Sequence, residues 1–184
     1  PFALRVAVIT LLSLALARPQ LSNRWQSEST EGIDIMMALD ISGTMLGEDL
    51  KPNRLEAAKA VATDFVLARS NDQIGLVVFA GESFTQCPLT TDHAVLVNLF
   101  QSVRFGMIED GTAIGLGLAN AVNRMKDSPT KSKVVILLTD GSNNRGDIDP
   151  ITAAEIAKTF NIRVYAIGVG SYNQEVPVPV HTPY

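Results

Sequence analysis

The chain has 184 residues, 46% of them hydrophobic, which is enough for a domain with a buried core and excludes a disordered polymer. Its formal net charge is −4 and no basic stripe occurs, so the charge pattern does not support nucleic-acid binding. Cys87 is the only cysteine, which excludes a disulfide within the chain. The two histidines, His93 and His181, lie too far apart to indicate a zinc site.

Residues 1–18 form an almost uninterrupted apolar run, which predicts a transmembrane or signal-anchor segment. The run is shorter than the ~20 residues of a spanning helix, so we expect this segment to be truncated. A cleaved signal peptide is the alternative, because Arg5 gives a charged front and residues 15–17 fit the small-x-small cleavage pattern. In an anchor, Arg5 would stay inside and place the domain outside the cytoplasm. Residues 19–31 are polar and are predicted to be a linker.

Short apolar runs then alternate with longer helical patterns, an order typical of a mostly parallel sheet. We therefore predict an α/β, doubly wound, Rossmann-like fold over residues 32–172, with helices on both faces of the sheet. The run 83–89 is expected at an edge, because Pro88 cannot donate to a neighbouring strand. Residues 173–184 are rich in proline and are expected to lead into a further C-terminal part. Strands are predicted at 33–39, 73–80, 83–89, 133–139 and 162–169, and helices at 52–69, 93–103, 112–125 and 150–160.

Three loops next to these elements carry carboxylate and hydroxyl side chains. In a parallel sheet, the loops after the carboxyl ends of the strands lie along one rim. Two carboxylates and three hydroxyls form an oxygen set that suits a hard cation, Mg²⁺ or Mn²⁺, so we predict one metal site there. Asp110 is expected to cap the helix that begins at Thr112 rather than bind the metal. The predicted ligands are Asp40, Ser42, Thr44, Thr112 and Asp140.

The D-x-S-x-T loop at 40–44, the later Thr112 and the T-D-G loop at 139–141 together resemble the von Willebrand factor A domain, over about residues 33–170. The resemblance implies that the predicted ligands form a metal-ion-dependent adhesion site. The family usually has serine where this chain has Thr44, and because threonine keeps the hydroxyl we expect metal binding to be retained. A narrower resemblance, in stretches such as PNRLEAAKAV and LLTDGSNN, is to the bacterial Bat (aerotolerance) membrane proteins.

These resemblances imply a function. With the adhesion site of the first, the charge of the predicted ligands favours a protein partner that supplies an acidic side chain to the metal, because Asp40 and Asp140 bring at most two negative charges. The loops 83–89, 106–110 and 142–147 are expected near the same rim and would add contact area. The second implies a domain anchored in the bacterial inner membrane, on the periplasmic side, that works with a MoxR-type AAA+ ATPase and other VWA proteins. The predicted function is thus a membrane-anchored, metal-dependent protein-binding module.

Enzymatic activity is not predicted, because the chain has no dinucleotide-binding, P-loop or G-x-S-x-G motif in a suitable place. The alternative is a metal-dependent phosphohydrolase of the haloacid dehalogenase type. Such enzymes also place an aspartate after the first strand and end the motif with threonine, as in D-I-S-G-T. They need a second aspartate two residues on, where this chain has Ser42, so the general acid is missing.

Overall fold

The computed structural model describes residues 2–16, 32–141 and 143–171. The apolar N-terminal run forms α1 (Phe2–Leu16), a helix of 15 residues whose apolar side chains are exposed at least as far as Leu12. The hydroxyl of Thr10 donates to the carbonyls of Val6 and Ala7 within the helix. Within the described parts of the chain, no helix is both long and apolar enough to span a bilayer. The linker predicted at 19–31 and the tail predicted at 173–184 lie outside the described residues.

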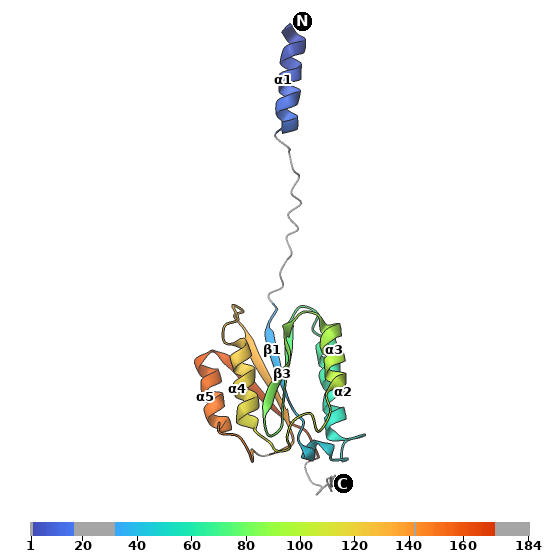
Figure 1. Ribbon diagram of the computed structural model, residues 1–184, viewed down its shortest axis with the longest axis vertical. Coiled ribbons are helices and arrows are strands. Elements are labelled where there is room, and N and C mark those ends of the chain that lie inside the picture. Colours follow the sequence, from blue (N-terminus) through green and yellow to red (C-terminus); the bar gives the residue numbers. More distant parts are fainter. Residues whose placement is uncertain (1, 17–31, 142, 172–184) are drawn as a thin grey trace.

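A five-stranded sheet forms the centre of the domain, in the order β3-β2-β1-β4-β5 (Figure 1). All neighbouring strands are parallel except β2 and β3, which are antiparallel. The strand with Pro88 lies at the edge, as predicted, because its outer side needs no hydrogen-bond donor. The strands are β1 (Asp34–Asp40), β2 (Gln73–Phe79), β3 (Ser83–Thr90), β4 (Lys133–Thr139) and β5 (Ile162–Gly168).

Helices cover both faces of the sheet, which confirms the predicted doubly wound fold. The helices α2 and α3 pack on one face and α4 and α5 on the other (Figure 1). The central strand β1 is buried along its whole length, because its alternate side chains enter one core or the other. The helices are α2 (Arg54–Leu67), α3 (His93–Ser102), α4 (Ile114–Met125) and α5 (Pro150–Thr159).

The face with α2 and α3 is not covered out to β5. These two helices pack over β1 and β2, whereas β5 is the far edge strand. As a result Tyr165 and Ile167 of β5 are 53% and 47% exposed, and they border a groove that Phe65 of α2 also lines. The sequence had predicted a strand here but gave no sign of this exposed face.

Two helix starts differ from the prediction. Pro52 does not open α2: the helix begins at Arg54, and the side chain of Asn53 caps it by accepting from the backbone N–H of Glu56 at 2.8 Å. The helix predicted from Thr112 begins two residues later, at Ile114. Both starts lie within two residues of the predicted ones, the range over which helix ends fray and periodicity does not define them.

The buried Asp34 has a structural role at the other end of the sheet. Its carboxylate accepts hydrogen bonds from the hydroxyls of Ser128 and Thr130, in the loop between α4 and β4. The side chain is therefore satisfied without an ion.

Candidate metal centre

The predicted oxygen ligands meet where the strand order of the sheet reverses. From β1 the chain continues to β2 on one side, whereas β4 and β5 lie on the other side. Asp40 is the last residue of β1, and Asp140 directly follows its neighbour β4. Ligands in open α/β sheets bind at such a switch point, outside the carboxyl ends of the strands.

A row of side-chain oxygens links these two strands. A 3-10 turn, Gly43–Leu46, follows β1 and holds Ser42 and Thr44 on the same side. The two hydroxyl oxygens are 3.0 Å apart, and the hydroxyl of Thr44 donates to Oδ1 of Asp140 at 2.7 Å. The structure thus brings residues that are 96 positions apart in the sequence into direct contact.

Asp40 is the most deeply buried member, with 0% of its surface exposed. Its Oδ1 accepts from the backbone N–H of Ser42 at 2.9 Å, and its Oδ2 accepts from the hydroxyl of Thr139 at 2.6 Å. Burial nevertheless raises the pKa of the Asp40 carboxyl, and these hydrogen bonds oppose the rise only in part. Among the described residues, no cationic side chain forms an ion pair with Asp40.

Thr112 reaches the same rim from the loop before α4. Its backbone N–H donates to the side chain of Asn144 at 2.8 Å, and its carbonyl accepts from the N–H groups of Asn144 and Arg145. Its hydroxyl oxygen lies 3.9 Å from where a Cβ on Gly141 would sit, beside Asp140. Within the described part of the chain, no side chain or carbonyl accepts from this hydroxyl.

The oxygen spacing fits a small octahedral cation. In an octahedron with metal–oxygen distances of about 2.0–2.1 Å, adjacent ligand oxygens are about 2.9 Å apart. The separations of 3.0 Å between Ser42 and Thr44 and 2.7 Å between Thr44 and Asp140 are ordinary hydrogen-bond distances, and they are compatible with this value. In the described residues, no three His, Cys, Asp or Glu side chains come together as a metal cluster, so hydroxyls are essential to the donor set.

Asp110 does not cap α4, contrary to the prediction. The cap position of α4 is Ala113, without a side-chain hydrogen bond. Instead, Oδ1 of Asp110 accepts from the backbone N–H groups of Gly43 and Gly111, at 2.8 and 2.9 Å. The carboxylate thereby fixes the loop that carries Ser42 and Thr44, because it ties that loop to the one before Thr112.

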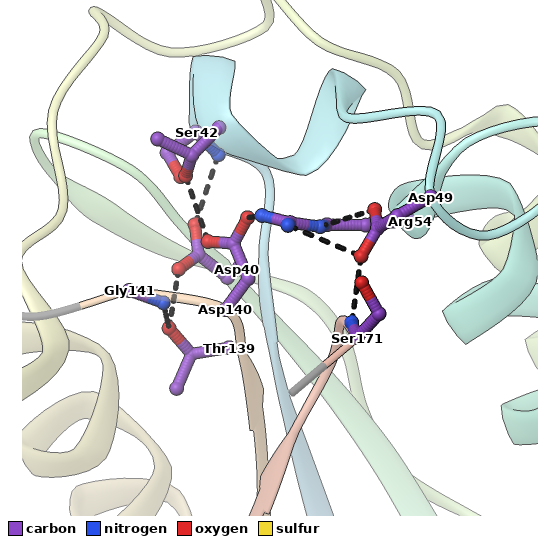
Figure 2. Close-up of polar contacts among 9 residues, drawn as sticks. Asp40, Ser42, Asp49, Arg54, Thr139, Asp140, Gly141 and Ser171 are labelled. Carbon is purple, nitrogen blue, oxygen red and sulfur yellow. Dashed lines mark hydrogen bonds and ion pairs between the residues drawn. The ribbon is translucent and has the colours of Figure 1, made fainter. Parts of the chain in front are cut away.

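Two charged residues at the site were not found from the sequence. Arg54, the first residue of α2, donates from Nη1 to Oδ2 of Asp140 at 2.7 Å. The same guanidinium donates to both oxygens of Asp49, and the backbone N–H of Ser171 donates to Asp49 as well (Figure 2). The hydrogen bonds from Arg54 hold the pKa of Asp49 well below its usual range. Thr139 was also missed, although it directly precedes Asp140 in the T-D-G motif.

Comparisons with known proteins place this geometry in a family. The sequence of residues 34–178 matches the von Willebrand factor type A domain. A curated UPF0353 protein from Mycolicibacterium paratuberculosis is 30% identical, over 99% of this chain and 59% of its own length. The chain spans about half the length of the curated relatives it matches, 48% in one of them.

Solved structures of similar fold point to the same family. An aerotolerance-related membrane protein from Bacteroides fragilis, with multiple mutations to serines, superposes with a TM-score of 0.75 and 34% identity, over 83% of this chain and 74% of that chain. Proximal thread matrix protein 1 from the mussel byssus, with a zinc-occupied MIDAS motif, gives a TM-score of 0.65 and 30% identity, over 78% of this chain and 37% of that chain. The chain therefore belongs to the von Willebrand factor type A domain family and is related to the bacterial Bat aerotolerance membrane proteins.

Proposed function

We propose that this domain is a membrane-anchored protein-binding module that depends on Mg²⁺ or Mn²⁺. The observation that carries the proposal is the row of oxygens at the switch point, from Ser42 through Thr44 to Asp140, with separations of 3.0 and 2.7 Å. Asp40, Ser42, Thr44, Thr112 and Asp140 would hold the ion. The zinc-occupied MIDAS motif of the mussel protein supports the assignment by analogy.

The charge of the site favours an acidic ligand. Only Asp40 and Asp140 in the ligand set carry a negative charge, and Arg54 already pairs with Asp140. Three ligands are neutral hydroxyls, which reduce the charge of a divalent ion very little. The bound ion supplies a Lewis-acidic centre to which a carboxylate oxygen, a hard ligand, can bind. We therefore propose that a Glu or Asp side chain of a partner protein completes the coordination, with a MoxR-type ATPase and other VWA proteins as the partners to test.

The loops around the rim would add contact area. Of the three loops predicted to add contact area, 106–110 lies next to the site, since Asp110 contacts Gly43. Only the Ser83 end of β3 is near the rim, because β3 runs antiparallel and Ser83 pairs with Phe79. The loop 142–147 includes Ser142, which lies outside the described residues.

Metal binding is tested by calorimetry with Mn²⁺ and Mg²⁺ on the purified chain. We expect one site, which Asp40→Ala abolishes. Asp64→Ala is the matched control, because Asp64 is an exposed carboxylate in α2, and it should bind as wild type does. Equal affinity of wild type and Asp40→Ala would reject the metal assignment.

Partner binding is tested with the purified MoxR-type ATPase from the same genome, in Mg²⁺ and in EDTA. We expect binding in Mg²⁺ that is lost in EDTA and in Thr112→Ala. Binding that survives both changes would reject the metal-bridged mechanism and leave the metal assignment intact. A complex that depends on metal but does not involve a partner Glu or Asp would reject the acidic-ligand step alone.

We also propose that residues 1–18 anchor the chain in the bacterial inner membrane, with the domain on the periplasmic side. In α1 the hydroxyl of Thr10 is satisfied by carbonyls of its own helix, which lowers the cost of placing it in lipid. Arg5 is the only charged residue of α1. Protease added to intact spheroplasts should digest the domain, and complete protection would show the opposite orientation.

We propose finally that the domain is not catalytic. The residue two positions after Asp40 is Ser42, whose hydroxyl lies within the oxygen row and is a poor general acid. Turnover of p-nitrophenyl phosphate that depends on Mg²⁺ and is lost in Asp40→Asn would contradict this and favour the phosphohydrolase alternative.

A further inference from the structure

The guanidinium of Arg54 is shared between two buried carboxylates. Nη1 donates to Oδ2 of Asp140 at 2.7 Å, whereas Nε and Nη2 donate to Oδ1 and Oδ2 of Asp49 at 2.7 and 3.2 Å (Figure 2). The side chains are 14%, 1% and 0% exposed for Arg54, Asp140 and Asp49. Water therefore screens these charges weakly, and each partner strongly affects the others.

The surroundings of Arg54 keep the guanidinium in place. A Cβ on Gly47 would come within 3.1 Å of Nε, and a Cβ on Gly170 within 3.2 Å, so these glycines make room for it. Gly170 also has a φ of +146°, which glycine adopts without strain. The backbone N–H of Arg54 donates to the carbonyl of Gly47 at 2.9 Å. Arg54 is therefore a fixed part of the rim rather than a mobile surface side chain.

We propose that Arg54 and Asp49 together set the charge of the metal centre. The inference rests on the proposed metal site and deepens it. Arg54 neutralises part of the negative charge of Asp140, and Asp49 withdraws part of the positive charge of Arg54. The pair thereby holds the metal affinity at an intermediate value and leaves the ion able to accept an acidic ligand. In this view Arg54 and Asp49 are positioning residues that act through Asp140 and do not touch the ion.

The proposal predicts changes of opposite sign in two single variants. Arg54→Met removes a positive charge next to Asp140, so the affinity for Mn²⁺ should rise, on the order of tenfold. In Asp49→Asn, Asp140 alone balances the positive charge of Arg54, so the affinity for Mn²⁺ should fall by a similar factor. A purely structural role predicts a fall in both variants, because each breaks the same hydrogen-bond network.

The double variant Arg54→Met/Asp49→Asn completes the cycle. It removes one charge of each sign, so its Mn²⁺ affinity should return to within about threefold of wild type. Loss of a structural network would instead leave the double variant at least as weak as the weaker single variant. Arg54→Lys keeps the positive charge but cannot bind both carboxylates as a fork, and it should stay close to wild type.

The experiment measures Mn²⁺ affinity by calorimetry for the purified 184-residue chain and its variants, with thermal unfolding without metal to confirm folding. Opposite signs in the single variants, with recovery in the double variant, support the proposal. A fall in both single variants, or no change in either of them, overturns it. If Arg54→Met does not fold, the comparison of Asp49→Asn with the double variant still tests the proposal. The Mn²⁺ affinity of the double variant must then recover from the lower value of Asp49→Asn toward that of wild type. If wild type binds no Mn²⁺, the proposed function itself is rejected.

Discussion

At the scale of single residues, Asp40 combines burial with charge in a way that does not favour stability. Its carboxylate is fully buried and has no cationic partner within the described residues, so its pKa is raised. A carboxyl whose pKa is higher in the folded state stabilises the fold below its ordinary pKa, and this contribution is lost as the pH rises through the raised value. At neutral pH the metal-free domain therefore has to bury an unfavourable charge.

Asp40→Asn should make the metal-free domain more stable at pH 7, because it removes this charge and keeps a similar shape. We expect a rise in Tm of about 2–4 °C, which corresponds to roughly 1 kcal/mol for a domain of this size. The gain should vanish below about pH 4, where Asp40 in wild type is protonated. Calorimetric scans with EDTA at pH 7 and pH 3.5 measure both values. A lower Tm for Asp40→Asn at pH 7 would contradict this account.

The contribution of Asp49 to the stability of the fold depends on pH in the opposite direction. Its hydrogen bonds from Arg54 lower its pKa in the folded state, so it stabilises the fold above its ordinary pKa near 4, and this is lost as the pH falls through the lowered value. Asp49→Asn should therefore be less stable than wild type at pH 7, with a difference that shrinks steadily below pH ~4. Urea unfolding of both proteins between pH 2.5 and pH 7 measures the difference. A constant difference over this range would show that the ion pair is not its cause.

At the scale of elements, two glycines let α4 approach its neighbours closely. A Cβ on Gly115 would lie 1.9 Å from the carbonyl oxygen of Ile148, and a Cβ on Gly117 would lie 2.6 Å from the ring of Phe79. Alanine is the better helix former by about 1 kcal/mol, so propensity alone favours alanine at both positions. Packing favours glycine instead, because α4 begins shortly after Thr112 and its start must stay close to the sheet.

Gly115→Ala should therefore destabilise the domain, although it raises helix propensity. We expect a loss of about 1–3 kcal/mol or more, because the backbone of Ile148 has to move. Gly168→Ala is the control: it is exposed, nothing lies within 4 Å of its Cβ position, and it should change stability by less than about 0.5 kcal/mol. Urea unfolding measures both variants. Similar stability of Gly115→Ala and wild type would show that α4 has room to shift.

At the scale of the whole molecule, the proposed metal site would connect parts of the chain that are far apart in sequence. In the proposed site, the loop after β1, the loop before α4 and the loop after β4 would each supply ligands. The unfolded chain would not bind an ion that needs all three loops, so the binding energy of such an ion would add to the stability of the entire domain.

Mn²⁺ at about 100 times its Kd should raise the free energy of unfolding by about 2.7 kcal/mol. Thr112→Val, which keeps the shape but removes a ligand hydroxyl, should lose most of this increase. Thr159→Val removes an exposed hydroxyl at the end of α5 and should keep all of it. Unfolding followed by circular dichroism, with and without Mn²⁺, compares the three proteins. An equal metal effect in Thr112→Val and wild type would remove Thr112 from the ligand set.

The sequence alone determined the order of elements and the chemistry of the predicted ligands. Buried strands and helical faces repeat with periods that are local in the chain, so β4 was predicted at its observed bounds and the edge position of β3 followed from Pro88. Asp40, Ser42, Thr44, Thr112 and Asp140 were predicted from short motifs next to strand ends and helix starts. Strand ends share a rim, so their proximity followed from the fold class.

Only the tertiary structure decided the charge around the site. Arg54 meets Asp140 across 86 positions and Ser171 meets Asp49 across 122, and no local pattern marks such pairs. Asp110 shows the same limit, because its position before a helix predicted a cap, whereas its carboxylate binds the backbone of Gly43, 67 positions away. Hydrophobic periodicity reports which face of an element is buried. It does not report which charged side chains the packed elements bring together, because that depends on how the loops at the rim fold against one another.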